Sequence, residues 1–332
     1  MRLTALENTP VDYTAEVKDD FIHLHGLIKG QFNSIPAEKM KFFEEVLKAT
    51  RSPGGSAANV CHGFANMGME SVFIGSTGND EAGEYYAEEL RKAGVIPYIE
   101  VKKGPTGKCL TLISYDKERT FAMNMGKSSS LLPWEFEAWQ IASSDIFHTT
   151  AYALDSMYWT VKRAMKIAKE NDVKISFDLA SVTSIQRHRK RIRHLLENYV
   201  DIVFANEEEA FEYTGENTIG AAITNDALRY KSRHSHSEHV VVLKLGSEGA
   251  RIYSDAKWGR KAVYAAIPAC NVSEVKNTNG AGDAFAAGFL YGVAKGHDFI
   301  KAGQIGAFYA AKVVEQESAR LPYRISNIEE LI

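Results

Sequence analysis

The sequence has 332 residues, of which 45% are hydrophobic and 24% charged, an ordinary globular composition with enough apolar residues for a sizeable core. Its 39 lysines and arginines against 42 acidic residues give a formal net charge of −3, which excludes the strong positive field typical of proteins that bind nucleic acids. No apolar run approaches the roughly 20 residues of a membrane span, and the N-terminus lacks a secretory pattern, so we expect a cytoplasmic protein without membrane or nucleic-acid partners.

From about residue 72, short apolar runs alternate with longer amphipathic runs. The pattern predicts strands at 71–76, 144–150, 174–180 and 201–205. It predicts helices at 80–94, 156–171, 189–199 and 206–215. Two strands around a turn are expected at 239–254, and two long helices after residue 280. Such alternation is typical of an α/β fold with a doubly wound, mostly parallel sheet flanked by helices, where ligands bind beyond the carboxyl ends of the strands.

Two segments, 13–35 and 98–125, do not follow this alternation. Each reads as a strand-rich hairpin without a crossover helix of its own. Together they are expected to form a small second sheet that acts as a lid over the strand ends. The sequence contains no internal repeat, so residues 1–332 are expected to form a single domain with this discontinuous lid.

The stretch RSPGGSAANVCHGFANMG, residues 51–68, places Gly54 and Gly55 ahead of a helix rich in small residues. Paired glycines let a ligand approach the backbone closely, and Asn59 offers both a donor and an acceptor to a hydroxyl group. A tight turn at the entry of a helix explains the same glycines without any ligand. From these residues alone, both interpretations stand.

The stretch NEEEA, residues 206–210, directly follows a predicted strand. Asn206 and Glu209 are three residues apart and would share one face of a helix. An amide and a carboxylate at a strand end suit Mg²⁺, which takes oxygen ligands and keeps much of its water shell. The alternative is that Asn206 simply caps a helix with an acidic first turn, and on these residues alone it is the stronger interpretation.

The stretch NTNGAGDAFAAGFLYG, residues 277–292, carries the clearest chemical pattern. Gly280, Ala281 and Gly282 at the start of a helix expose backbone N–H groups without intrahelical partners, which attract anions such as phosphate. Asp283 would repel a phosphate, so we interpret it as a base that takes a proton from an attacking hydroxyl group. An ordinary acid favoured by the helix dipole is the alternative. The sequence has no GxxxxGK[ST] motif, so this is not a Walker P-loop.

Three further stretches give weak signals. In LKLGSEG, residues 243–249, a hairpin turn is sufficient, and Lys244 would gain a role only beside a phosphate site. The histidines of HSHSEH, residues 234–239, suit a solvated loop better than a metal site. The basic run 187–196 suits a charged helix face better than a nucleic-acid surface.

The stretches GGSAANVCHGFANMG and NTNGAGDAFAAGFLYG resemble the two signatures of the ribokinase-like (PfkB) family of carbohydrate and nucleoside kinases. They occur in the right order and at the expected separation, and PTGKCLTLIS, NEEEA and LKLGSEGA also fit. The resemblance implies a doubly wound α/β core with a β-sheet lid, which in many members also forms a homodimer interface. It implies transfer of the γ-phosphoryl group of ATP to a primary alcohol of a small-molecule substrate, with Mg²⁺ as cofactor.

Carried over residue by residue, the resemblance implies a role for each matching position. Asp283 matches the catalytic base, and the anion hole matches Gly280, Ala281 and Gly282. The residues that organise Mg²⁺ and phosphate match Asn206 and Glu209. The positions that bind substrate hydroxyl groups match Asp12, Gly54, Gly55 and Asn59. On the ATP side, the nucleotide loop matches Lys244, Gly246 and Gly249, and Arg119 resembles a lid arginine that closes on the phosphates.

The sequence departs from the family pattern at two positions near these motifs. The second signature usually opens with Asp, and this chain has Asn277 there. In many members that acid helps to hold a monovalent cation beside the anion hole, so the neutral Asn277 weakens the case for activation by K⁺. The strand leading to Asp12 usually carries a glycine where this chain has Glu7.

The acceptor is only weakly specified by the sequence. TNGAGD and the lid stretch AEVKDDFIHLHGLIKG resemble the adenosine-kinase-like branch more than ribokinase itself, and lid aromatics such as Phe21, Phe32 and Phe121 would stack on a base or form lid core. We therefore expect a ribonucleoside, with a sugar such as fructose, ribose or a 2-keto-3-deoxy acid as the alternative. An intact Asp283 argues against a non-catalytic binding relative, and the lack of an early GxGxxG argues against a dinucleotide-binding oxidoreductase.

Overall fold

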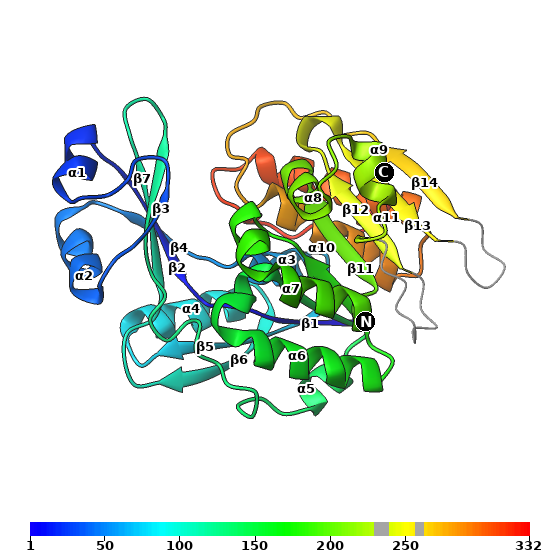
Figure 1. Cartoon of the computed structure of the whole chain (residues 1–332), viewed down its shortest axis with the longest axis horizontal. Helices are drawn as coiled ribbons and strands as arrows, with labels where there is room; N and C mark the ends of the chain where they lie inside the picture. Colours follow the sequence, from blue (N-terminus) through cyan, green and yellow to red (C-terminus); the bar gives the residue numbers. More distant parts are fainter. Residues whose placement is uncertain (229–238, 256–261) are drawn as a thin grey trace.

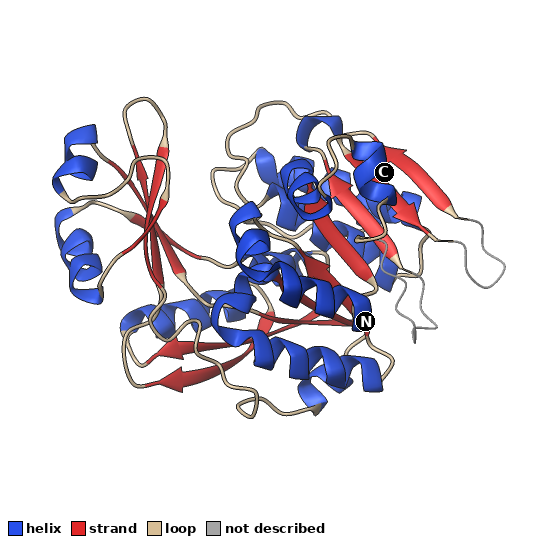
Figure 2. Cartoon of the chain, viewed as in Figure 1, coloured by secondary structure: helices blue, strands red, loops and turns tan. Residues whose placement is uncertain are grey.

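The computed structural model describes residues 1–228, 239–255 and 262–332. These residues form a large sheet with helices on both faces and a second, smaller sheet to one side of it (Figure 1 and Figure 2). The expected α/β architecture with a small additional sheet is therefore confirmed. None of the helices in these ranges is long and apolar enough to cross a membrane.

The large sheet of the described residues has nine strands in the order β14-β13-β12-β11-β10-β9-β1-β5-β6. The strands from β12 to β6 are parallel, and β13 and β14 are antiparallel at one edge. Strands β11 and β12 are buried on both faces, which is why they read as continuous apolar runs. In chain order, the bounds are β1 Arg2–Leu6, β5 Glu70–Gly78, β6 Val95–Lys102, β9 Ile146–Thr150, β10 Lys174–Asp178, β11 Ile202–Asn206, β12 Val240–Lys244, β13 Ala250–Ser254 and β14 Val263–Ile267.

Helices cover both faces of the large sheet, as the alternation predicts. One face shares a buried core with α3 (Ser56–Asn66), α4 (Glu81–Lys92), α10 (Ala281–Ala294) and α11 (Phe299–Val314). The other face shares a second core with α5 (Trp139–Ala142), α6 (Leu154–Glu170), α7 (Val182–Asn198), α8 (Glu207–Thr214) and α9 (Ile219–Thr224).

Small residues allow α10 to pack closely against its two neighbouring helices. A Cβ atom on Gly288 would lie 2.8 Å from the Cα atom of Gly306 in α11. A Cβ atom on Gly63 of α3 would lie 2.6 Å from the Cβ atom of Ala287. The run of small and apolar residues that follows Asp283 is therefore a buried helix whose position is fixed from two sides.

Among the described residues, the second sheet has five strands in the order β3-β8-β7-β2-β4. Helices α1 (Asp19–Leu24) and α2 (Ala37–Val46) pack on one face of it, where Ile22, Phe43 and Leu112 belong to a separate buried core. Figure 1 shows this unit at the left, joined to the large sheet by the chain around β2 and β4. The bounds are β2 Val11–Glu16, β3 Phe32–Ser34, β4 Thr50–Pro53, β7 Lys108–Ile113 and β8 Arg119–Asn124.

The structure corrects the expected make-up of the second sheet. Residues 13–35 are not a hairpin, because α1 separates β2 from β3, and β3 pairs in parallel with β8. Residues 98–102 extend β6 of the large sheet, so only β7 and β8 of the segment 98–125 enter the second sheet, as an antiparallel pair. The sequence does not predict β4, whose residues carry no apolar alternation and pair with β2 at the sheet edge.

Candidate active site

The start of α10 has the shape expected of an anion-binding helix terminus. Gly280 is the N-cap residue with φ of 75°, and a Cβ atom there would lie 2.9 Å from the backbone oxygen of Ala319. Both the left-handed backbone and this close contact require glycine. A Cβ atom on Gly282 would lie 3.3 Å from the Nζ atom of Lys244, so an ammonium group stands beside the first turn of the helix.

Asp283 is held by two side chains from the first turns of α3. The hydroxyl group of Ser56 donates to Oδ1 of Asp283 at 2.6 Å, and the Nδ2 atom of Asn59 donates to Oδ2 at 2.8 Å. Burial raises the pKa of Asp283, whereas these two hydrogen bonds and the charge of Lys244 lower it. The two hydrogen bonds thus fix the orientation of the carboxylate, whereas burial leaves its pKa above the usual value for an aspartate.

The two glycines before α3 are explained by close backbone and side-chain contacts. A Cβ atom on Gly54 would lie 2.5 Å from a carboxylate oxygen of Asp12, which is on β2 of the second sheet. Gly55 has φ of 94°, and a Cβ atom there would lie 3.0 Å from the backbone oxygen of Asn8. The structure therefore brings Asp12, Gly54 and Gly55 to the N-terminal end of α3, where Asn59 meets Asp283.

Polar side chains gather where β10, β11 and β12 end. Lys244, the last residue of β12, places its Nζ atom 2.5 Å from Oδ2 of Asp178, the last residue of β10, and both side chains are largely buried. Asn206 ends β11 between them and pairs with Lys244 in the sheet register. These residues lie at the carboxyl ends of adjacent parallel strands, where ligands bind in folds of this kind.

Asn206 and Glu209 form a reciprocal capping box at the start of α8. The side chain of Asn206 accepts from the backbone N–H of Glu209 at 2.8 Å, and the carboxylate of Glu209 accepts from the backbone N–H of Asn206 at 2.8 Å. Burial, and after it the charge of Asp178, raise the pKa of Glu209 to about 7. The capping interpretation of NEEEA is thus confirmed, and the excess of buried negative charge is compatible with a cation nearby.

The second sheet reaches this region through Arg119. Its Nη1 atom donates to Oδ1 of Asn279 at 2.5 Å, across to the loop that precedes α10. Arg119 lies on β8 in register with Ile113 of β7, on the face opposite the helices α1 and α2. The face of the second sheet that carries Arg119 is therefore turned toward the start of α10.

Comparison with known proteins identifies the family. The family model described as pfkB family carbohydrate kinase matches residues 41–325. The chain belongs to this family. Relatives include an adenosine kinase from Saccharomyces cerevisiae, 25% identical over 96% of both chains, and a 5-dehydro-2-deoxygluconokinase from Shouchella clausii, 28% identical over 85% of this chain and 86% of the relative. The crystal structure of adenosine kinase from Sinorhizobium meliloti covers 97% of this chain and 96% of its own, with a TM-score of 0.82 and 26% identity.

These similarities make the protein a nucleoside or sugar kinase, a phosphotransferase that acts on an alcohol group. The recognition made from the two glycine-rich stretches is confirmed. The roles of individual residues stay predictions, and the structure adds where each of them lies.

Two glycines expected on the ATP side of this kinase lie in the connection between β12 and β13. Gly246 is exposed in a short 3₁₀ turn (Gly246–Glu248) between β12 and β13. Gly249 has φ of 84°, and a Cβ atom there would lie 2.0 Å from the backbone oxygen of Ile267, so its backbone and the close approach of β14 both require glycine. Of the stretch HSHSEH, residues 234–238 lie outside the described residues.

Sequence reasoning gave no site role to four side chains around Asp283 and Asn59 in the kinase, although it noted Glu7 as a departure from the family pattern. Ser56 and Asp178 lie in stretches that it examined, and Asp178 had a usable signal because it ends a buried strand. Arg320 follows α11 in a segment without a motif, and its Nε atom donates to Oδ1 of Asn59 at 2.9 Å. Glu7 is 1% exposed, accepts a hydrogen bond from the hydroxyl group of Thr150, and its pKa is raised by burial to about 8.

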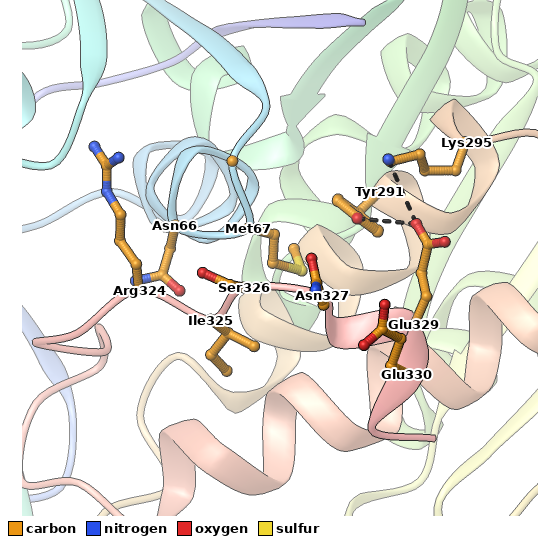
Figure 3. A pocket seen from close by; sticks show the side chains of 11 residues that line it. Asn66, Met67, Tyr291, Lys295, Arg324, Ile325, Ser326, Asn327, Glu329 and Glu330 are labelled. Carbon is orange, nitrogen blue, oxygen red and sulfur yellow. Dashed lines mark hydrogen bonds and ion pairs between the residues drawn. The ribbon is translucent and has the colours of Figure 1, made fainter.

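A cavity of about 360 Å³ lies away from this group of residues (Figure 3). Asn66 at the end of α3 and Tyr291 near the end of α10 line it, together with the C-terminal segment that carries Arg324 and Glu329. Tyr291 and Lys295 both contact the Glu329 carboxylate, as the dashed lines in Figure 3 show. The same two helices thus carry the candidate catalytic residues at their N-terminal ends and this cavity at their C-terminal ends.

Proposed function

We propose that the kinase transfers the γ-phosphoryl group of ATP to the primary hydroxyl group of a ribonucleoside, with Asp283 as the base. The observation that carries this proposal is the position of Asp283 in the first turn of α10, oriented by Ser56 and Asn59. A general base must lie within hydrogen-bonding reach of the proton it takes, in a fixed orientation.

In the proposed reaction, Asp283 accepts the proton of the acceptor hydroxyl group as its oxygen attacks the γ-phosphorus. A new O–P bond forms, and the bond between the γ-phosphorus and the oxygen that bridges it to the β-phosphate breaks, which leaves ADP. The N–H groups at the start of α10 and the ammonium group of Lys244 would stabilise the negative charge on the transferred group. Arg119 on the second sheet would help to cover the phosphates and exclude water.

The residues at the strand ends fit a hydrated Mg²⁺ better than a directly bound metal. No group of three His, Cys, Asp or Glu side chains in the described part of the chain is arranged to hold a metal ion. The carboxylates of Asp178, Glu209 and Asp283 nevertheless influence one another, with Lys244 as the nearby cation. Asn206 and Glu209 would hold the ion through its water molecules, and when bound it would neutralise charge on the phosphates.

The site-facing side of the second sheet supports a ribonucleoside as the acceptor. Phe121 and Met123 alternate with buried Thr120 and Ala122 along β8, so they share the face that carries Arg119. Phe32 on β3 stacks on Phe121 with ring centroids 4.4 Å apart and is 61% exposed. An exposed aromatic surface suits a planar base more than a bare sugar. A sugar kinase remains the alternative, since a 5-dehydro-2-deoxygluconokinase is among the relatives.

Asn277 makes a hydrogen bond that would take the place of a monovalent cation. Its Nδ2 atom donates to the backbone oxygen of Glu317 at 2.7 Å. An aspartate at this position has no proton to donate, so two oxygen acceptors would face each other and a cation between them would be favourable. We therefore expect activity without K⁺, and we expect Asn277→Asp to become dependent on K⁺.

A homodimer through the second sheet stays a prediction. Helices α1 and α2 cover the face of that sheet that points away from Arg119, so a second subunit would have to contact the helices instead. Leu24 and Ile28 are 81% and 60% exposed there. Light scattering of the purified protein measures the oligomeric state directly.

The proposal is tested by ATP consumption over a panel of nucleosides and sugars, with and without K⁺, followed by mass analysis of the phosphorylated product. We expect the highest kcat/KM for a ribonucleoside, and equal rates with Na⁺ or K⁺. Preference for a sugar or sugar acid would contradict the proposed acceptor, and no transfer to any alcohol would contradict the function. Asn277→Asp assayed with the same panel completes the cation test, because unchanged activity without K⁺ in this variant would refute the role given to Asn277.

A further inference from the structure

We infer that Arg320 is a positioning residue that fixes the side-chain amide of Asn59 and, through it, the carboxylate of Asp283. This inference rests on the proposed role of Asp283 as the base. Arg320 belongs to neither glycine-rich stretch and lies in the segment that follows α11.

The inference starts from two consecutive hydrogen bonds. The Nε atom of Arg320 donates to Oδ1 of Asn59 at 2.9 Å, and Nδ2 of Asn59 donates to Oδ2 of Asp283 at 2.8 Å. A guanidinium group has only donors, whereas an amide has one acceptor and one donor side. Arg320 therefore forces the oxygen of Asn59 to face it, and this leaves the NH₂ group of Asn59 pointing at Asp283.

Without Arg320, the Asn59 amide would be oriented by Asp283 alone, and its oxygen would lose the donor that holds it away from the carboxylate. In the opposite orientation, the amide oxygen would face the carboxylate, and the two acceptors would repel each other. Asp283 would then keep Ser56 but lose one of its two donors. Loss of a hydrogen bond to the charged form raises the pKa of a carboxylic acid.

The backbone that carries Arg320 is anchored to both helices of the site. On the α10 side, Glu317 accepts from Asn277, and Ala319 contacts Gly280 so closely that a Cβ atom there would be 2.7 Å from the Cβ atom of Ala319. On the α3 side, Nδ2 of Asn66 donates to the backbone oxygen of Tyr323 at 2.5 Å. The segment that carries Arg320 thus contacts both sides of the site, and these contacts place its guanidinium group between α3 and α10.

The electrostatic cost of Arg320 also indicates a role beyond stability. Burial lowers the pKa of its guanidinium group, and its Nη2 atom is buried without a hydrogen-bond partner among the described residues. A buried unsatisfied donor is unfavourable for folding, so a leucine or methionine would suit a purely structural position better. Asp12 and Asp283 are the acidic groups whose charges favour its charged form.

Many titratable groups surround Arg320, Asn59 and Asp283, so the pH dependence of kcat alone does not report on Asp283. Several of them have pKa values raised into the range of the assay, among them Asp12 at about 7, Glu209 at about 7 and Glu7 at about 8. Among the described residues, eleven titratable groups interact electrostatically with Arg320 or Asp283. They are Glu7, Asp12, Cys61, His62, Tyr85, Tyr86, Tyr152, Asp178, Glu209, Lys244 and Tyr309.

The test compares Arg320→Met and Arg320→Lys with Arg324→Met as the matched control. Arg324 lies in the same segment but lines the cavity at the far ends of α3 and α10. We measure kcat and KM for the acceptor between about pH 5 and pH 9, and we titrate the carboxyl carbon of Asp283 by ¹³C NMR, with its signal assigned by its loss in Asp283→Asn. Circular dichroism establishes that each variant is folded.

For Arg320→Met we expect kcat to fall about 10- to 100-fold at neutral pH, with a smaller change in KM. The pKa of Asp283 and the acidic limb of the kcat profile should both move upward by about one pH unit. Arg320→Lys keeps the charge without the Nε–H donor and should show an intermediate shift, and it replaces the Met variant if that one does not fold. Arg324→Met should match the wild type in both measurements.

The inference is overturned if Asp283 titrates in folded Arg320→Met or Arg320→Lys as it does in the wild type. It is also overturned if Arg324→Met moves the pKa of Asp283 as far as Arg320→Met does, because the effect would then be a general loosening of the segment. The NMR titration needs no turnover, so it separates this inference from the proposed function. If the wild type were inactive but the pKa of Asp283 still rose in Arg320→Met as expected, only the proposed kinase function would be contradicted.

Discussion

The two sheets contribute different chemistry to the same region of the molecule. The large sheet ends in polar groups that already have partners, such as the ion pair of Lys244 with Asp178 and the hydrogen bond of Asn206 to Glu209. The second sheet brings half-buried or exposed apolar side chains, such as Phe121 and Phe32, and one arginine that contacts the start of α10. Under the proposed function, we expect the large sheet to fix the groups of the phosphoryl transfer, and the second sheet to recognise the acceptor and shield the reaction.

The burial of charge explains why the large sheet suits the chemical step. Preorganised charges in a water-excluded site stabilise a transition state without reorganising as the reaction proceeds. The second sheet has its own small core under α1 and α2. The side chains on its other face, toward α10, do not belong to that core. Substitutions should therefore affect kcat when they fall at the strand ends, and KM when they fall on the second sheet.

The variant Lys244→Met gives the strongest test of the prediction that the strand ends determine kcat. We expect a loss of kcat of about 10²- to 10³-fold, because an ammonium group beside the transferred phosphoryl is removed. We also expect the free energy of unfolding to fall by about 3–5 kcal/mol, since Asp178 is left buried without its partner. Steady-state kinetics and urea denaturation measure the two effects.

Two further variants control this experiment. Adding Asp178→Asn to Lys244→Met should recover part of the stability but little of kcat, because it removes the unpaired charge without restoring the cation. Lys174→Met, at the exposed opposite end of β10, should change neither quantity. A full kcat in folded Lys244→Met would contradict the role of the strand ends.

The buried carboxyl group of Glu7, which directly follows β1 of the large sheet, should make the stability of the protein depend on pH. Its pKa is raised from 4.5 to about 8 in the folded protein, so the folded state holds a proton that the unfolded state has lost between these values. Stability should therefore fall as pH rises from about 4.5 to about 8, by up to about 1.4 kcal/mol per pH unit for this group. Glu7→Gln should flatten that slope in urea denaturation at several pH values, and an unchanged slope would show that Glu7 is ionised in the fold.

Arg119→Ala tests the second sheet and should have the smallest effect. We expect KM to rise by about tenfold or less while kcat and the melting temperature stay close to the wild type, because the contact with Asn279 is exposed. Lys41→Ala on α2 is the control, since it removes a cation from the helix-covered face of the same sheet. A large loss of kcat in Arg119→Ala with an unchanged KM would contradict the prediction that the second sheet affects binding of the acceptor rather than the chemical step.

The sequence predicted the strand-helix order and singled out Asp283 as a candidate base because both leave local patterns. Buried strands such as β11 are continuous apolar runs, and the glycines before Asp283 are adjacent in the chain. Strand β4 was missed because it is short, polar and defined only by its pairing with β2. The hairpin expected at 13–35 was wrong because a pattern of apolar residues does not decide which distant strand will pair with β3.

Several side chains of the site were beyond the reach of sequence patterns. Arg320 lies 261 positions from Asn59, and Asp283 lies 227 positions from Ser56. Contacts over such separations depend on how the helices pack, which here follows from small residues on α3, α10 and α11. Gly249 has a structural explanation that the sequence does not show, since a Cβ atom there would lie 2.0 Å from the backbone oxygen of Ile267 in β14, and its place in a nucleotide loop stays a prediction.

The most direct measurement of the central claim is a single turnover with saturating ATP and acceptor, in wild type and in Asp283→Asn. The variant removes the proton acceptor while leaving an amide of the same shape, so folding and binding should persist. We predict that the rate of phosphoryl transfer falls by about 10²- to 10⁴-fold in the variant, with both ligands still bound. An equal rate in the two proteins would contradict the claim that Asp283, held by Ser56 and Asn59 at the start of α10, is the catalytic base.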